Sequence, residues 1–173
     1  MRRVVLQEGE AFFNVAHDPA RPFVVEAASG HVQALGTAFD IKLGADAVVV
    51  AVSERSVEVS LAGVPSVIVR EGQQVRYGAA QLSAVREADL AQVQAWRHDR
   101  LVFQEATLGD VIADLERYRG GRIVMTDSSL RDMPVSGEFD TRQADAAIDT
   151  LASALSIRVR RLTDFLVVLS PKA

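Results

Sequence analysis

The sequence predicts an α+β fold: an all-β first half, a multi-strand sheet or solenoid-like stack, and then a small α/β module. Up to about residue 85, short runs with apolar residues at every second position are separated by turn signals, which is typical of half-buried strands. After residue 99, apolar residues also recur three and four positions apart, which is the spacing of a helix. The change of period predicts a β domain at 1–86, a linker helix at 87–99 and an α/β module at 100–173.

The β domain is expected to contain eight short strands. Their alternation is clearest in 56–61, where valine and leucine occupy every second position. Short strands at such even spacing favour a sheet, a sandwich or a solenoid-like stack. The expected strands are 10–16, 23–27, 32–35, 38–43, 47–52, 57–61, 64–69 and 73–77.

The α/β module is expected to hold two helices between short strands. Thr107 has the position of an N-cap, and Asp110 at the third helical position complements the helix dipole. Asp140 and Gln143 form a capping-box pattern before the second helix. The order of elements predicts two βαβ-like units with right-handed crossovers, and then a final strand. The expected strands are 101–103, 122–126, 133–139, 157–161 and 165–169.

Composition excludes several classes of function. The chain has 173 residues, a formal net charge of −4 and no cysteine, so disulfides and cysteine nucleophiles are excluded. No basic stripe indicates nucleic-acid binding. No run reaches the ~20 apolar residues that a membrane-spanning helix needs. A role outside the cytoplasm would therefore make this chain part of a longer, anchored protein.

No motif for catalysis, cofactor binding or metal binding stands out. His17, His31 and His98 lack the spacing of metal ligands. The segment around Gly36 has too few glycines for a phosphate-binding loop. Asp110 and Asp114 lie one helical turn apart, and we expect them on a solvated face. The chain is therefore predicted not to be an enzyme.

Arginines and edge-strand residues are the candidates for protein contact. The cluster around Arg119 and Arg122 either complements a helix end or forms a basic rim. Arg158 and Arg160 alternate with apolar residues, an arrangement that either protects an edge strand or selects a partner strand. The predicted partner-binding residues are Arg119, Arg122, Met133, Val135, Arg158 and Arg160.

Two groups of residues carry a family resemblance. Gly-Glu-Ala-Phe-Phe at 9–13 and Leu-Gly-Thr-Ala-Phe at 35–39 resemble, in order and spacing, the periplasmic domain of FecR-type regulators. The second half is similar to the secretin and TonB short N-terminal module, called STN, through 101–103, 123–124, 135–137 and 151–157. One departure is Arg55, which stands where the family usually has a turn glycine.

The resemblance implies a function in signalling. FecR-type proteins are single-pass inner-membrane anti-sigma factors, so this chain would be a periplasmic region whose transmembrane helix lies outside it. Its partner would be the N-terminal signalling domain of a TonB-dependent receptor, in the control of iron and siderophore uptake. An ECF sigma factor would be bound only through a cytoplasmic domain that this chain lacks. The family's β domain begins with an earlier strand, so an open sheet edge and weak self-association are also expected.

The alternative is a periplasmic small-molecule or glycan-binding β domain. Surface aromatic residues in strand grooves would be its signature. Aromatic residues make up 6% of the chain, and the phenylalanines of the first half are better interpreted as core.

Overall fold

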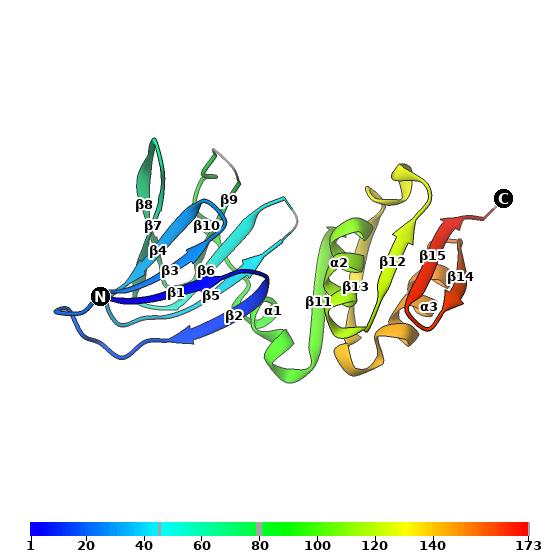
Figure 1. The fold of residues 1–173 in the computed structure, drawn as a ribbon, viewed down its shortest axis with the longest axis horizontal. Coiled ribbons are helices and arrows are strands. Elements are labelled where there is room, and N and C mark those ends of the chain that lie inside the picture. Colours follow the sequence, from blue (N-terminus) through cyan, green and yellow to red (C-terminus); the bar gives the residue numbers. More distant parts are fainter. Residues whose placement is uncertain (45, 79–80, 173) are drawn as a thin grey trace. The chain divides into compact units, whose positions relative to one another are not determined.

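The computed structural model describes residues 1–44, 46–78 and 81–172, which form two compact units, Met1–Val93 and Gln94–Ala173 (Figure 1). The first unit is built of strands and the second of strands with helices. Each unit has its own hydrophobic core.

Two five-stranded sheets make up the first unit. One sheet has the order β1-β3-β4-β7-β8 and the other β10-β9-β6-β5-β2. The strands are β1 (Arg2–Leu6), β2 (Gly9–Asn14), β3 (Phe23–Ala27), β4 (Gly30–Ala34), β5 (Ala38–Leu43), β6 (Val48–Glu54), β7 (Ser56–Leu61), β8 (Val64–Arg70), β9 (Gln73–Tyr77) and β10 (Arg86–Glu87).

The core of this unit lies between its two sheets. Val25 and Val59 of one sheet and Phe39, Ile41 and Val50 of the other are all fully buried in one cluster. The unit is therefore a β-sandwich, and the solenoid-like alternative was wrong. Alternation within a strand shows which residues face inward, but it does not show which sheet they face.

The structure adds strands that the sequence pattern missed. β1 pairs parallel with β3, whereas the other strand pairs described in this unit are antiparallel. Its side chains range from half-buried to exposed, and Val5 is 55% exposed. An edge strand with so little burial has no clear alternation, which is why its sequence carried no signal.

Tyr77 connects the two sheets. It belongs to β9, and its hydroxyl donates a 3.0 Å hydrogen bond to the carbonyl of Ala27, at the end of β3. The Tyr77 ring lies over Gly30, where a Cβ would come within 2.5 Å of a ring carbon. Burial raises the pKa of Tyr77 to about 12. This contact holds the sheets together at one end of the sandwich.

The predicted linker helix at 87–99 was wrong as a continuous element. It is replaced by the short helix α1 (Leu90–Val93) of the first unit and the 3-10 helix η1 (Ala95–His98) of the second. Asp99 then adopts the left-handed conformation, with φ of 58°. The helices α1 and η1 are so short that their hydrogen bonds do not offset the cost of helix nucleation. The packing of each segment on the core of its own unit therefore determines the path of the backbone here.

The second unit has the predicted order of strands and helices. Its elements are β11 (Arg100–Thr107), α2 (Leu108–Tyr118), β12 (Arg122–Met125), η2 (Ser128–Leu130), β13 (Pro134–Asp140), η3 (Thr141–Gln143), α3 (Ala144–Ala154), β14 (Ile157–Thr163) and β15 (Leu166–Pro171). They form a two-stranded sheet, β11-β13, and a three-stranded sheet, β12-β15-β14.

The strand pairing of this unit corrects the predicted βαβ units. The strands on either side of α2, β11 and β12, lie in different sheets, and so do β13 and β14 on either side of α3. The parallel pair described here is β12 with β15. Each strand can bury its apolar side next to several neighbours, so pairing is a long-range choice that the local pattern does not determine.

The helix caps follow the sequence closely. Thr107 caps α2, with its Oγ1 accepting a 3.1 Å hydrogen bond from the backbone N–H of Asp110, as predicted. Asp140 is also a cap, but it caps η3 by accepting a 2.9 Å hydrogen bond from the N–H of Arg142. The predicted second helix therefore begins one 3-10 turn later.

Candidate functional site

The three-stranded sheet of the second unit has one face on the core and one face in solvent. Ile123, Ile157, Val167 and Leu169 point inward and are buried. Because side chains alternate along a strand, the residues between them point outward. We call this solvent-facing surface the outer face; it consists of Arg122 and Val124 of β12, Arg158 and Arg160 of β14, and Leu166, Val168 and Ser170 of β15.

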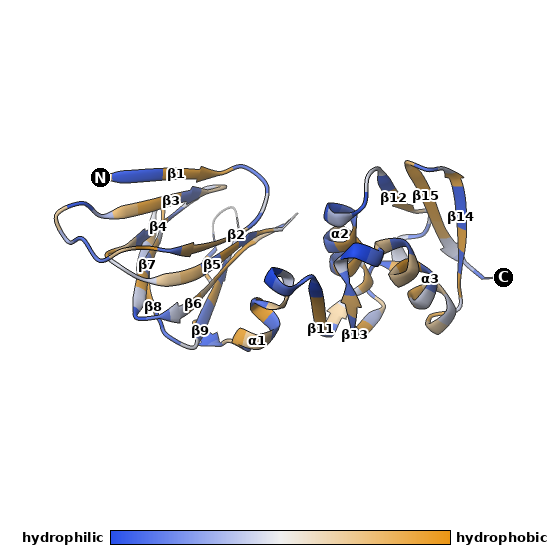
Figure 2. Cartoon of the chain, turned by 90° about the horizontal axis from the view of Figure 1, so that it is seen from below, coloured by the Kyte–Doolittle hydropathy of each residue, from blue (hydrophilic) through white to orange (hydrophobic). Residues whose placement is uncertain are grey.

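The outer face combines an apolar centre with arginine flanks. Figure 2 shows hydrophobic residues along β15, which lies between β12 and β14. Val124 is 44% exposed. At the hairpin end of the same sheet, Leu162 is 54% and Phe165 is 70% exposed. Single exposed apolar residues are ordinary, but several on one sheet indicate a contact surface.

The positive charges of the arginines on the outer face have few acidic neighbours. The cross-strand neighbours of Arg158 and Arg160 on β15 are Ser170 and Val168. Within the described part of the chain, neither arginine forms an ion pair. Arg122 is 82% exposed at its side chain, and its Nε lies 3.6 Å from Glu116 Oε1. No carboxylate belongs to the outer face, so its charge is positive.

Arg119, another predicted contact residue, is held inside the unit. Its side chain is 6% exposed, and its Nε lies 2.8 Å from Asp145 Oδ1. Its Nη2 donates a 2.7 Å hydrogen bond to the carbonyl of Asp164, and its Nη1 donates to that of Gly120. This arginine joins the end of α2 to the start of α3 and to the β14–β15 hairpin. Its geometry favours a structural role.

Met133 and Val135 also face the core. Val135 is 5% exposed and belongs to the buried cluster of the second unit. Met133 is half-buried against this cluster, and its carbonyl accepts a 2.8 Å hydrogen bond from the N–H of Leu108. Of the six predicted residues, the structure therefore brings Arg122, Arg158 and Arg160 together on one surface and places the other three elsewhere.

Asp114 corrects the expected solvated helix face. It is 4% exposed, and its Oδ1 lies 3.2 Å from Nη1 of Arg117, one turn along α2. Asp110, by contrast, is exposed and accepts a 2.9 Å hydrogen bond from Oγ1 of Thr107. A period of 3.6 residues separates the faces of a helix coarsely, so a residue at the boundary of the apolar stripe can be buried.

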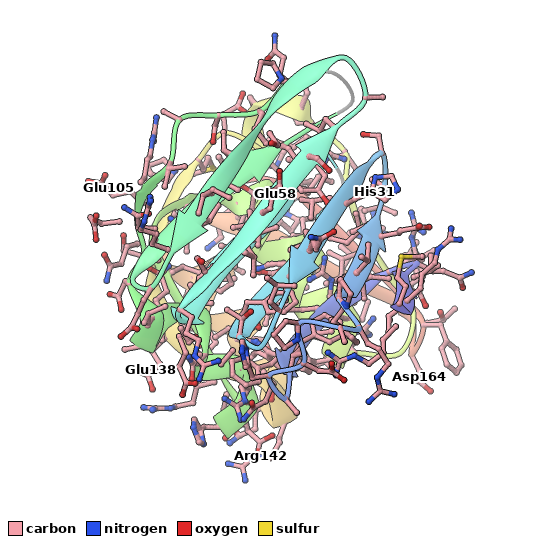
Figure 3. The ribbon with its side chains drawn as sticks, turned by 90° about the vertical axis from the view of Figure 1, so that its left-hand side faces the viewer. His31, Glu58, Glu105, Glu138, Arg142 and Asp164 are labelled. Atoms are coloured by element: carbon pink, nitrogen blue, oxygen red, sulfur yellow. The ribbon has the colours of Figure 1, made fainter. Side chains whose placement is uncertain are left out.

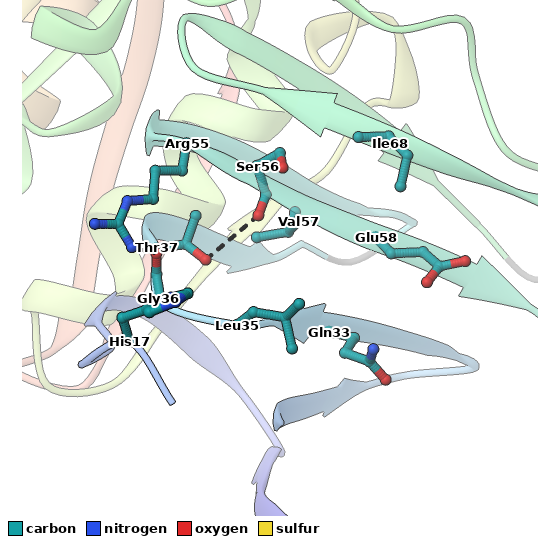
Figure 4. A pocket seen from close by; sticks show the side chains of 10 residues that line it. All are labelled: His17, Gln33, Leu35, Gly36, Thr37, Arg55, Ser56, Val57, Glu58 and Ile68. Carbon is teal, nitrogen blue, oxygen red and sulfur yellow. Dashed lines mark hydrogen bonds between the residues drawn. The ribbon is translucent and has the colours of Figure 1, made fainter. Parts of the chain in front are cut away.

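The first unit carries a small hollow around Thr37 and Arg55. Its volume is about 220 Å³, and Figure 4 shows Arg55 and Thr37 in its wall. Arg55 has a left-handed backbone, with φ of 62°, and donates a 3.0 Å hydrogen bond to the carbonyl of Gly36. Thr37 Oγ1 donates to the carbonyl of Ser56 at 3.4 Å. Ligand pockets usually measure ~300–1,000 Å³, so this hollow is small for one.

Polar side chains on the outer surface of the sandwich have partners of their own. Figure 3 shows His31 and Glu58 on the sheet that is turned to the viewer. His31 Nε2 lies 3.6 Å from Glu26 Oε1, and Glu58 accepts a 2.7 Å hydrogen bond from Ser66. Among the described residues, no group of three or more potential metal-binding side chains comes together. In the described part of the first unit, neither the small hollow nor these paired side chains support the small-molecule alternative.

Comparison with known proteins matches both halves of the chain. A family model described as FecR protein matches residues 1–58, and one described as FecR, C-terminal matches residues 100–166. No curated protein matches the chain. In the described residues, no helix is both long enough and apolar enough to cross a bilayer.

Two crystal structures of a candidate anti-sigma factor from Parabacteroides distasonis ATCC 8503 share the fold. The structure at 1.65 Å has a TM-score of 0.83 and 28% identity, over 96% of this chain and 79% of that one. The structure at 2.50 Å has a TM-score of 0.82 and 28% identity, over 96% of this chain and 78% of that one. The likeness therefore extends over both units of the chain.

Proposed function

Because this chain belongs to the FecR family of anti-sigma regulators, we propose that it is the periplasmic, partner-binding region of such a regulator. Its partner is the N-terminal signalling domain of a TonB-dependent outer-membrane receptor. The regulated genes are those of iron and siderophore uptake. A contact between proteins suffices for this role, so no catalytic residue is required.

The observation that supports the proposal is the outer face of the second unit. Protein interfaces place exposed apolar residues at their centre and are enriched in arginine. Val168 lies on the central strand β15 with Val124 beside it on β12, and Arg122, Arg158 and Arg160 lie on the flanking strands β12 and β14. The residues come from strands of one sheet, so their positions are already set before a partner arrives. Such preorganisation lowers the entropic cost of binding.

The signalling step follows from a change in this contact. Transport of a ligand would alter how the receptor domain presents itself to the outer face. The altered contact would expose the stalk between this region and the membrane to regulated proteolysis, which would release the sigma factor. The β-sandwich would act as a rigid spacer.

Isothermal titration calorimetry with the N-terminal signalling domain of the TonB-dependent receptor encoded beside this chain tests the proposal. We expect saturable one-to-one binding. Combined substitution of Arg122, Arg158 and Arg160 by alanine should weaken it by about tenfold or more, because arginine is enriched among the interface residues whose truncation costs over about 1 kcal/mol.

Arg131→Ala is the matched control, because Arg131 is an exposed arginine of the same unit outside the outer face. It should leave the affinity within about twofold of the unmodified chain. A chain that is folded by circular dichroism but does not bind the receptor domain would contradict the proposed partner.

A further inference from the structure

The structure points to how the partner binds. We infer that it adds a strand to the free edge of β14 and presents carboxylates at alternate positions to Arg158 and Arg160. This inference rests on the proposed function for the identity of the partner, but its chemistry follows from the edge itself. Strand addition supplies affinity through backbone hydrogen bonds and specificity through alternate side chains.

The two edges of the sheet β12-β15-β14 differ. The N–H groups of Arg122, in β12, and of Thr126, just after it, donate to carbonyls in and next to β15. The alternate N–H of Ile123 points away from β15, and the carboxylate of Glu116 accepts a hydrogen bond from it at 2.6 Å. This edge is therefore partly covered by a side chain of α2.

The β14 edge presents uncovered backbone groups. The N–H of Lys172 donates to the carbonyl of Ser156 at 3.3 Å, which sets the phase of the antiparallel ladder between β14 and β15. Because bonded pairs alternate, Arg158 and Arg160 bond to β15, and the backbone groups of Val159 and Arg161 point outward. In the described part of the chain, no strand pairs with β14 on that side.

The side chains of this edge define which strand can bind. On an added strand, the residues opposite Arg158 and Arg160 would have Cβ atoms about 4.5–5.5 Å away, and they would be two positions apart. Because these arginines have no acidic neighbour on β15, carboxylates on the added strand would supply their first ion pairs. The edge therefore selects a strand with acidic residues at alternate positions.

The residue between the two carboxylates faces the opposite side of the sheet. There Val159 packs against the core, and Arg161 already pairs with Asp149, its Nη2 lying 2.8 Å from Asp149 Oδ1. An apolar side chain fits this position better than a charged one. A second copy of this chain would set its own arginines against Arg158 and Arg160, so repulsion disfavours self-pairing at this edge.

Nuclear magnetic resonance of the whole chain with two peptides tests the edge without the receptor. One peptide alternates glutamate with threonine, and its control alternates lysine with threonine. We expect the glutamate peptide to shift the amide signals of Val159 and Arg161 with saturation, and the lysine peptide to leave them unchanged. Equal effects of both peptides, or shifts centred on β12, would overturn the inference.

Titration of the receptor signalling domain into charge variants provides the second arm. Arg158→Glu with Arg160→Glu should weaken binding by about a hundredfold, since reversing both charges replaces attraction by repulsion. Lysine at both positions should retain most of the affinity, and Arg131→Glu should retain all of it. If the charge-reversed chain fails to fold, the variant with lysine at both positions still tests whether positive charge is required.

The two arms separate this inference from the proposed function. Shifts by the glutamate peptide without any receptor binding would remove the proposed receptor and leave the edge chemistry standing. Receptor binding that is unchanged by the charge-reversed pair would retain the receptor and overturn the edge as its site.

Discussion

Substitution of Arg119 by alanine tests whether this residue is a structural tie. Its side chain is 6% exposed and forms three hydrogen bonds, to Asp145, Gly120 and Asp164. Gly120 is the next residue in the chain, but Asp145, at the start of α3, and Asp164, in the β14–β15 hairpin, are distant in sequence. The substitution would therefore loosen one end of the second unit.

The expected cost follows from the environment of these partners. A hydrogen bond to a charged group contributes about 1.5–3 kcal/mol when its partners are well shielded. Here the Asp145 side chain is 56% exposed, and Gly120 and Asp164 are exposed, so water can replace part of each lost bond. Loss of the packed aliphatic stem adds to the cost. We expect the free energy of unfolding to fall by about 2–3 kcal/mol.

Calorimetry and circular dichroism can measure this change. For a unit of this size, a loss of 2–3 kcal/mol lowers the melting temperature by roughly 10–15 °C. Arg122→Ala is the control, because that side chain is 82% exposed, and it should change the free energy by less than about 0.5 kcal/mol. Equal effects of the two substitutions would refute the structural role of Arg119.

Two further predictions concern stability. Tyr77→Phe keeps the ring but removes the hydroxyl that donates to the buried carbonyl of Ala27, so denaturant titration should show a loss of about 1–2 kcal/mol at neutral pH. Because the folded pKa of Tyr77 is raised to about 12, its contribution is present below pH ~10 and lost as the pH rises towards 12; a phenylalanine chain with the same alkaline profile would contradict this. At Asp140, the hydrogen bond from the Arg142 side chain lowers the pKa to about 2, so its stabilising contribution is present above pH ~4 and is lost as the pH falls through 2. Thermal melts between pH 4 and pH 2 should therefore decline less steeply for Asp140→Asn, and parallel curves would contradict the assignment.

The local signals of the sequence determined the elements and their caps. Alternation marked the strands of the sandwich, and Thr107 marked the start of α2. The spacing of Arg158 and Arg160 already indicated that both side chains share one face of a strand. These features depend on residues within a few positions of one another, so a single sequence is enough to recognise them.

The tertiary structure alone decided pairing and burial. Whether β11 pairs with β12 or β13 depends on segments far apart in the chain, and both choices satisfy the same local pattern. The burial of Arg119, Asp114 and Val135 likewise depends on what covers them. An arginine looks the same in sequence whether it lies in solvent or joins three segments. Only the path of the whole chain separates the structural Arg119 from Arg158 and Arg160, which remain exposed on the outer face.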